Sequence, residues 1–147
     1  MKIFDYDDLG SKRSWDYSSE GASPEDDGIS PIYETDKNIS MGDLLIINDV
    51  AYCICSMSGK GNIYNICYVE KLKNQDVFIN NKEPKSQNYT DDITCPYCGT
   101  EIESWEMEDY KDEYICESCG STFSYQRNVT VEYCSQPVKK GEAIRLN

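Results

Sequence analysis

The sequence reads CPYCG at residues 95–99 and CESCG at residues 116–120, with seventeen residues between the two Cys-x-x-Cys pairs. Two residues between a pair of cysteines let one tight turn present both sulfurs to one metal ion, and Zn²⁺ takes four such ligands as a tetrahedron. The glycine after each pair, Gly99 and Gly120, permits the positive φ that such a turn adopts. The spacing fits a known zinc pattern. It predicts one zinc ion held by Cys95, Cys98, Cys116 and Cys119.

Four thiolate ligands leave the metal no open position, so the predicted site is structural rather than catalytic. Strand-like residues flank both turns, at 93–94 before the first turn, at 113–115 before the second and at 122–125 after it. Two metal-binding turns joined by hairpin strands make a zinc ribbon. The alternatives to zinc at this step are iron in a rubredoxin-like site, or four unliganded thiols in an apolar core.

The connection between the two cysteine pairs is strongly acidic, because residues 101–117 hold eight acids and a single base, Lys111. Aromatic side chains alternate with the acids. Such a surface repels phosphate backbones and attracts basic proteins. We therefore predict that it avoids nucleic acid and contacts a basic partner; the alternative is a solvated acidic face with no partner. The predicted contact residues are Glu103, Trp105, Glu106, Glu108, Asp109 and Tyr110.

The charge divides the chain into three parts, and these give the predicted domains. Residues 1–36 carry a net charge of −7, residues 37–88 carry +1 and residues 89–147 carry −7, for a total of −13. The first part is rich in Ser, Gly, Pro and acids over 18–31, which predicts an acidic N-terminal arm that is partly flexible. Its aromatic residues either pack on their own domain or bind a partner. Residues 82–88 are predicted to be a linker.

The middle part is predicted to be a small β domain. Runs rich in β-branched and aromatic residues cover 44–47, 50–57 and 63–72, and Gly, Asn and Asp lie between them. This pattern predicts a small antiparallel sheet or an SH3-like barrel, with 77–80 as a candidate fourth strand. A further strand over 128–135 joins the zinc ribbon to complete a mainly β fold. We expect the two halves to share one core, because neither is large.

Four further cysteines, Cys53, Cys55, Cys67 and Cys134, lie outside the motif. They are predicted to be buried side chains that act as small apolar groups, with a second metal site as the alternative. The sequence has no histidine, which excludes Ser-His-Asp and Cys-His catalysis and histidine-ligated metals. It also shows no phosphate-binding or HExxH motif. We therefore expect a binding protein and not an enzyme.

The sequence predicts neither a membrane helix nor a secretion signal. No run approaches the roughly 18–20 apolar residues of a membrane helix. Acids stand among the first ten residues, where a signal peptide has a basic and then an apolar region. We expect a cytoplasmic protein, because a reducing compartment favours metal-bound or buried thiols over disulfides.

The pattern CPYCG…CESCG followed by an aromatic strand, over roughly residues 90–135, resembles zinc-ribbon proteins of phages and prophages of Gram-positive bacteria. The segment GDLLIINDVAYCIC at 42–55 is similar to SH3-like barrels of phage and translation proteins. The acidic, Cys-rich and Tyr-rich chain also resembles metal-binding anti-CRISPR proteins against type II RNA-guided nucleases. That resemblance implies an inhibitor in the host bacterial cytoplasm that binds the nuclease and stops it engaging DNA. The alternatives are a phage virion or assembly protein and a zinc-ribbon accessory factor of transcription. Only Cys95, Cys98, Cys116 and Cys119 carry over as functional residues.

Overall fold

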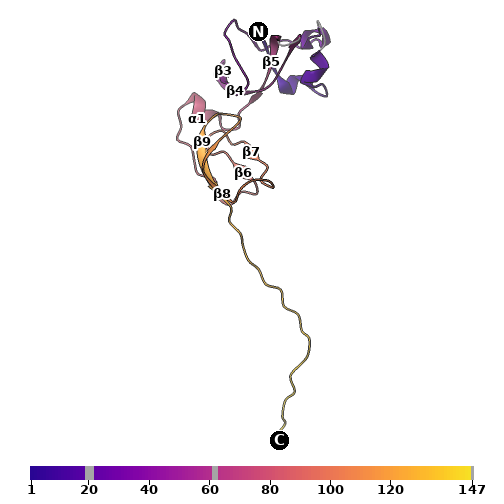
Figure 1. The fold of residues 1–147 in the computed structure, drawn as a ribbon, viewed down its shortest axis with the longest axis vertical. Helices are drawn as coiled ribbons and strands as arrows, with labels where there is room; N and C mark the ends of the chain where they lie inside the picture. The colour runs from indigo at the N-terminus through magenta and orange to yellow at the C-terminus, as the bar shows by residue number, and fades with distance from the viewer. Residues whose placement is uncertain (19–21, 61–62, 147) are drawn as a thin grey trace.

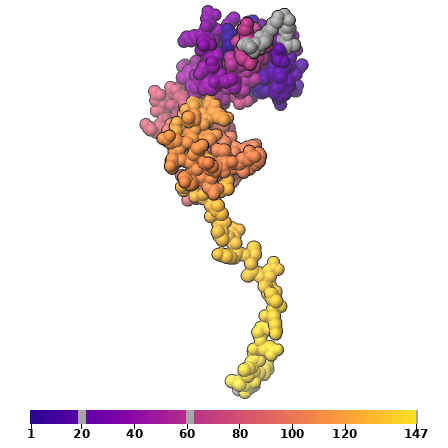
Figure 2. Space-filling view, in the orientation of Figure 1, coloured from indigo at the N-terminus to yellow at the C-terminus, as the bar shows by residue number. Residues whose placement is uncertain are grey.

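A computed structural model describes residues 1–18, 22–60 and 63–146 of the chain. The fold is mainly β, as predicted. A five-stranded sheet curls into a half-barrel, and two small hairpins beside it carry the four-cysteine cluster (Figure 1). Residues 128–146 leave the second part as an extended segment, which Figure 2 shows in yellow.

The predicted antiparallel meander forms one side of the five-stranded sheet. β3 (Leu44–Ile47), β4 (Val50–Lys60) and β5 (Ile63–Lys71) pair antiparallel in chain order. Asn48 and Asp49 form the two-residue turn between β3 and β4, and both adopt positive φ. Short polar side chains tolerate this conformation best after glycine, and it matches the twist of a hairpin. Local turn chemistry therefore fixes this register.

The N-terminal segment supplies the rest of the sheet. β1 (Lys2–Asp5) lies parallel to β5 and antiparallel to β2 (Tyr33–Glu34), so the strand order is β2-β1-β5-β4-β3. Ile3 and Phe4 of β1 are buried on opposite faces of the sheet, in two different core clusters. The start of the predicted acidic arm is thus a buried strand, and the sheet is mixed rather than purely antiparallel.

In the described residues between β1 and β2, the chain forms three 3₁₀ helices. They are η1 (Tyr6–Leu9), η2 (Ser14–Tyr17) and η3 (Pro24–Asp27). The buried Tyr17 ring packs on the sheet, and its hydroxyl donates a 2.7 Å hydrogen bond to Asp27. This contact holds the stretch predicted to be loop against the half-barrel. Part of that stretch, residues 19–21, lies outside the described residues.

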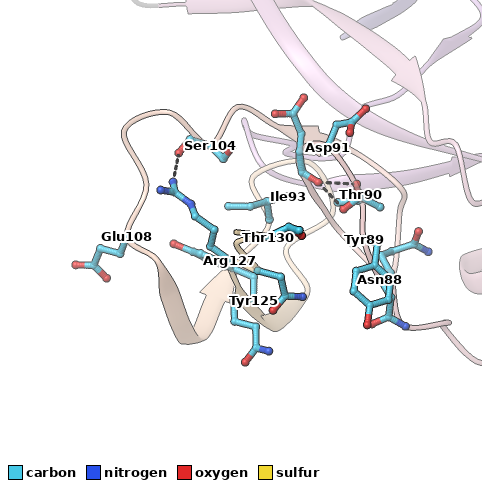
Figure 3. Close-up of a pocket in the computed structure, with 15 residues that line it drawn as sticks. Asn88, Tyr89, Thr90, Asp91, Ile93, Ser104, Glu108, Tyr125, Arg127 and Thr130 are labelled. Carbon is cyan, nitrogen blue, oxygen red and sulfur yellow. Dashed lines mark hydrogen bonds between the residues drawn. The ribbon is translucent and has the colours of Figure 1, made fainter. Parts of the chain in front are cut away.

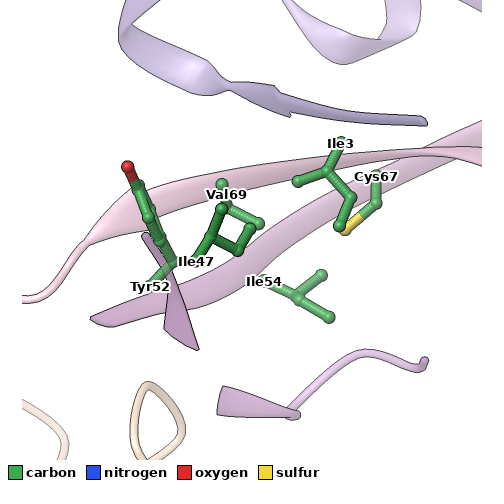
Figure 4. Close-up of a cluster of buried hydrophobic side chains, with 6 residues drawn as sticks. All are labelled: Ile3, Ile47, Tyr52, Ile54, Cys67 and Val69. Atoms are coloured by element: carbon green, nitrogen blue, oxygen red, sulfur yellow. The ribbon is translucent and has the colours of Figure 1, made fainter. Parts of the chain in front are cut away.

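The half-barrel is stabilised by apolar clusters on both faces of its sheet. One cluster, drawn in Figure 4, consists of Ile3, Ile47, Tyr52, Ile54, Cys67 and Val69. The other lies under the 3₁₀ helices and consists of Phe4, Leu9, Tyr17, Ile66 and Tyr68. Both faces of β5 are therefore covered, which explains why its buried residues run continuously in sequence instead of alternating.

Two predicted strands are wrong. Residues 77–80 belong mostly to a single helical turn, α1 (Gln75–Ile79), because the Gln75 side chain binds both the N–H and the carbonyl of Ala51 and turns the chain away from the sheet. Residues 128–135 form no strand, since no strand lies beside them in the described part of the chain. No helix among the described residues is long and apolar enough to span a bilayer.

The second part of the molecule consists of two hairpins, as the flanks of the cysteine motif predicted. β6 (Ile93–Thr94) pairs with β7 (Glu101–Ile102), and β8 (Tyr110–Ile115) pairs with β9 (Thr122–Gln126). Each hairpin carries one Cys-x-x-Cys pair in or beside its turn. The linker predicted at 82–88 contains no helix or strand.

Candidate metal centre

The structure brings Cys95, Cys98, Cys116 and Cys119 together, and their Sγ atoms all lie within 4.8 Å of one another. The Sγ atoms of Cys95 and Cys119 are 3.8 Å apart, and those of Cys98 and Cys116 are 3.7 Å apart. A tetrahedron with Zn–S bonds of ~2.3 Å has S···S edges of about 3.8 Å. The group can therefore hold one metal ion with no change in these two distances.

The two turns repeat the same backbone hydrogen bonds. The N–H of Gly99 donates to the Cys95 carbonyl at 2.9 Å, and the N–H of Gly120 donates to the Cys116 carbonyl at 2.8 Å. In both turns the N–H of the first cysteine donates at 2.9 Å to the carbonyl five residues further on. Both glycines adopt positive φ, 80° and 73°, as predicted. The chain thus builds one metal-binding turn twice.

The environment of the sulfurs suits thiolates. Cys95, Cys98 and Cys116 are buried, Cys119 is half-buried, and the Cys98 Sγ lies 3.1 Å from the Thr100 hydroxyl oxygen, a distance at which the hydroxyl donates to a thiolate. Hydrogen bonds from Cys95 and Cys98 lower the pKa of Cys119. The bond to Cys119 raises the pKa of Cys95 in turn. These opposite pKa shifts arise because the cysteines share protons. A divalent cation removes the need to share them, because it binds all four groups as thiolates.

The donor set favours zinc. Four sulfur ligands suit zinc or iron and do not suit Mg²⁺ or Ca²⁺, which bind oxygen. The four protein ligands fill the tetrahedron, so no coordination position is left for a water or a substrate. This arrangement fits the predicted structural metal.

The metal centre also joins the two halves of the molecule. Its sulfurs belong to an apolar cluster whose buried members are Ala51, Leu72, Cys95, Cys98, Cys116 and Phe123. Ala51 and Leu72 come from the half-barrel side and Phe123 from β9. The backbone N–H of Asn74, just after β5, donates to the Cys98 carbonyl at 3.0 Å. The two halves therefore share one of the three apolar clusters, as expected, while the other two clusters belong to the half-barrel alone.

The other four cysteines do not gather. Cys53 packs beside the metal centre, Cys55 under the 3₁₀ helices and Cys67 in the opposite cluster, while Cys134 is exposed in the C-terminal segment. Within residues 1–18, 22–60 and 63–146, none of them joins a group of three or more potential ligands. Burial raises the pKa of Cys55 and of Cys67 to about 12, so both thiols are protonated at neutral pH. Cys67 is buried and Cys53 and Cys55 are half-buried, but the prediction of a buried thiol is wrong for Cys134, which is exposed.

The connection between β7 and β8, residues 103–109, together with Tyr110 at the start of β8, is called the acidic loop below. All six predicted contact residues in it are exposed: Glu103, Trp105, Glu106, Glu108, Asp109 and Tyr110. Trp105 is 76 % and Tyr110 67 % exposed. Other aromatic rings of the chain are as exposed, among them Trp15 at 68 % and Tyr89 at 90 %, so the acids around Trp105 and Tyr110 are what distinguish this loop.

The sequence did not reveal how the acidic loop is held, which depends on Arg127. The Arg127 guanidinium binds the Asp109 carboxylate at 3.1 Å and the Ser104 carbonyl at 3.4 Å, and its backbone N–H donates to the Asp109 carbonyl at 2.6 Å. A signal existed, because Arg127 and Lys111 are the only bases between residues 89 and 138. Within the loop, Trp105 Nε1 donates to Glu103 at 3.3 Å.

An open cavity of about 450 Å³ lies beneath the acidic loop, between the linker and the start of the C-terminal segment (Figure 3). Its lining includes Asp91, Glu108, Arg127 and Tyr125. The Tyr125 hydroxyl is buried without a hydrogen-bond partner among the described residues. No sequence pattern marks this cavity, because its walls come from three separate segments.

No family model matches this chain, and no curated protein or solved structure is significantly similar to it.

Proposed function

We propose that this chain is a zinc-stabilised binding protein that inhibits a basic, nucleic-acid-handling protein by occupying its nucleic-acid site with the acidic loop. One observation carries the proposal: two exposed aromatic rings, Trp105 and Tyr110, stand among exposed acids on a connection anchored beside a four-cysteine metal centre. Aromatic anchors within a charged rim are typical of the residues that dominate binding energy at protein interfaces.

The charges of the loop are not all equally available to a partner. Glu103 already accepts a hydrogen bond from Trp105, and Asp109 forms an ion pair with Arg127, which follows β9. Glu106 and Glu108 are exposed and make no side-chain hydrogen bond or ion pair with any described residue. These two carboxylates are therefore the ones proposed to meet Lys and Arg on the partner.

The net charge of −13 also favours a basic partner. It steers the chain toward a positively charged groove and away from nucleic acid. A loop fixed by a metal centre and by Arg127 also loses little conformational entropy on binding. Such an inhibitor acts by stoichiometric occupancy and needs no catalytic group.

The first partner to test is a type II RNA-guided nuclease, because the acidic, cysteine-rich composition resembles metal-binding anti-CRISPR proteins that act on that class. These enzymes hold the guide–target heteroduplex in a positively charged channel. An acidic loop in that channel competes directly with DNA. A phage-encoded chain with this activity acts in the cytoplasm of the bacterial host.

The experiment measures binding of the zinc-loaded protein to the purified nuclease–guide complex, together with DNA binding and cleavage by that complex. The test variant is E106K/E108K, and the matched control is D7K/D8K. The control makes the same change in net charge at two exposed carboxylates of η1, on the half-barrel. We expect the wild type and D7K/D8K to inhibit at a stoichiometric ratio, and E106K/E108K to lose binding by tenfold or more, at roughly 1.4 kcal/mol per factor of ten.

Two outcomes count against the proposal. Equal loss in both variants would mean that only net charge matters, and an unaffected E106K/E108K would remove the acidic loop from the interface. If the nuclease is not bound, the same variant pair serves as matched baits in a bacterial lysate. Capture of RNA polymerase would then favour a transcription accessory factor, and co-purification with virions would favour a particle component.

A further inference from the structure

The C-terminal segment continues the side-chain pattern of β9 beyond the end of that strand. Phe123 and Tyr125 of β9 pack toward the metal centre. Val129, Val131 and Tyr133 follow at the same two-residue spacing, while the positions between them are polar. Residues two apart in a strand share one face. Arg127 interrupts this face between Tyr125 and Val129, so the pattern predicts a strand whose apolar face is made of two stretches, 123–125 and 129–133.

The structure pairs only the first part of this strand. The ladder to β8 ends at the pair Tyr110–Gln126. Beyond it, Val129, Val131 and Tyr133 are 77 %, 71 % and 93 % exposed, and no described strand lies beside them (Figure 1). A strand with one apolar face and two open edges is a template for pairing with another chain.

We propose that the occupant is a second copy of this chain: residues 128–134 of two copies pair antiparallel about a two-fold axis at Val131. A two-fold interface uses the same surface twice, so the segment must be complementary to itself. In this register Val131 faces Val131 of the second copy, and Val129 faces Tyr133. Both pairs put apolar side chains opposite each other, which stabilises a sheet.

The polar face is also compatible with self-pairing. Thr130 lies opposite Glu132 and Asn128 lies opposite Cys134, so no charge directly faces a like charge. Across 128–147 there are two acids and three bases, a net charge of +1, whereas residues 1–127 carry −14. The paired residues 128–134 carry one charge, Glu132, and the three bases follow them at 139, 140 and 145, so two copies repel each other less at this segment than at the acidic parts 1–36 and 89–127. A basic partner, by contrast, is drawn to the acidic remainder of the chain.

The test is the molar mass of the full-length, zinc-loaded protein in solution, measured by light scattering or sedimentation over a range of concentrations. We expect a concentration-dependent dimer, twice the 16.8 kDa of one chain. V131K places two lysines opposite each other at the axis and should give a monomer. The matched control T130K places its lysine opposite Glu132 of the second copy and should keep the dimer.

A cross-link checks the register independently. N128C places its thiol opposite Cys134 of the second copy, and mild oxidation should give a covalent dimer that N128C/C134S does not form. Directly opposed strand residues are close enough for this bond. A wild type that is monomeric at every concentration overturns the proposal. So does a V131K dimer as stable as the wild-type dimer, or an N128C dimer that does not cross-link. These measurements do not depend on the acidic loop, so their outcome is independent of whether the proposed function is correct.

Discussion

Replacing the two turn glycines with alanine tests the metal centre and its attachment in one experiment. Gly99 and Gly120 occupy equivalent positions in two equivalent turns, with φ of 80° and 73°. An L residue in this left-handed region costs about 1–2 kcal/mol. If backbone strain were the only cost, the two substitutions would destabilise the protein equally.

The surroundings of the two glycines differ, and this difference sets the expected magnitude. A Cβ on Gly99 would lie 3.1 Å from Asn74 Oδ1 and 3.2 Å from Lys73 Cβ, whereas a Cβ on Gly120 would meet nothing within 4 Å. The Lys73 Cβ cannot withdraw freely, because the backbone beside it is held by the hydrogen bond from the Asn74 N–H to the Cys98 carbonyl. Overpacking of this type costs roughly 1–3 kcal/mol. We therefore expect G120A to cost about 1–2 kcal/mol and G99A about 2–4 kcal/mol.

The assay is urea unfolding of the zinc-loaded proteins, followed by circular dichroism. The free energies of unfolding are compared with one common slope of free energy against urea concentration. Both variants should still bind about one zinc ion, because neither change removes a ligand. If G99A costs no more than G120A, the first turn does not pack against the residues that follow β5.

Three further predictions concern the metal, the shared core and pH. C116S should lose stoichiometric zinc and unfold at a lower temperature, while C67S, a change at another buried thiol, should keep the metal; elemental analysis separates the two. Leu72 is 4 % exposed in the cluster that joins the two halves, so L72A should lower the free energy of unfolding by about 2–5 kcal/mol in chemical denaturation. The control V138A, at a fully exposed site, should lower it by about 0.5 kcal/mol or less. Burial, and then the hydrogen bond to a carboxylate, raise the pKa of Tyr17 from 10.0 to about 12. The unfolded state loses this proton first, so stability should fall as pH rises from about 10 to about 12, and Y17F should reduce that fall; a slope unchanged in Y17F would contradict it.

The metal centre could be predicted because its chemistry is local. Two residues between cysteines and a following glycine determine one turn, and the same turn occurs twice. The turn at Asn48 and Asp49 is local in the same way, which is why the meander was predicted correctly. In each case the residues that determine the structure are neighbours in sequence.

The features that the sequence did not reveal depend on contacts between distant segments. β1 has only four residues and pairs in parallel with β5, more than fifty residues away, so no short pattern could place it. Residues 77–80 have strand-like side chains, but hydrogen bonds from Gln75 to β4 turn the chain into α1. Tertiary contacts override local propensity in both places.

The C-terminal segment shows the opposite situation. Its alternation from Val129 to Tyr133 is a sound strand pattern, yet a strand needs a neighbour for its backbone groups. One copy of the chain provides none among the described residues. The prediction of a strand within the zinc-ribbon-like part was therefore wrong for the single chain, and self-pairing is the proposed reason that the pattern exists.

The central claim is that the four thiols of Cys95, Cys98, Cys116 and Cys119 bind one zinc ion. The most direct test is the metal content per chain of freshly purified protein, measured by elemental analysis alongside protein concentration. We expect about one zinc per chain, as one closed tetrahedral site requires. Protein that is folded but contains no stoichiometric metal would contradict it.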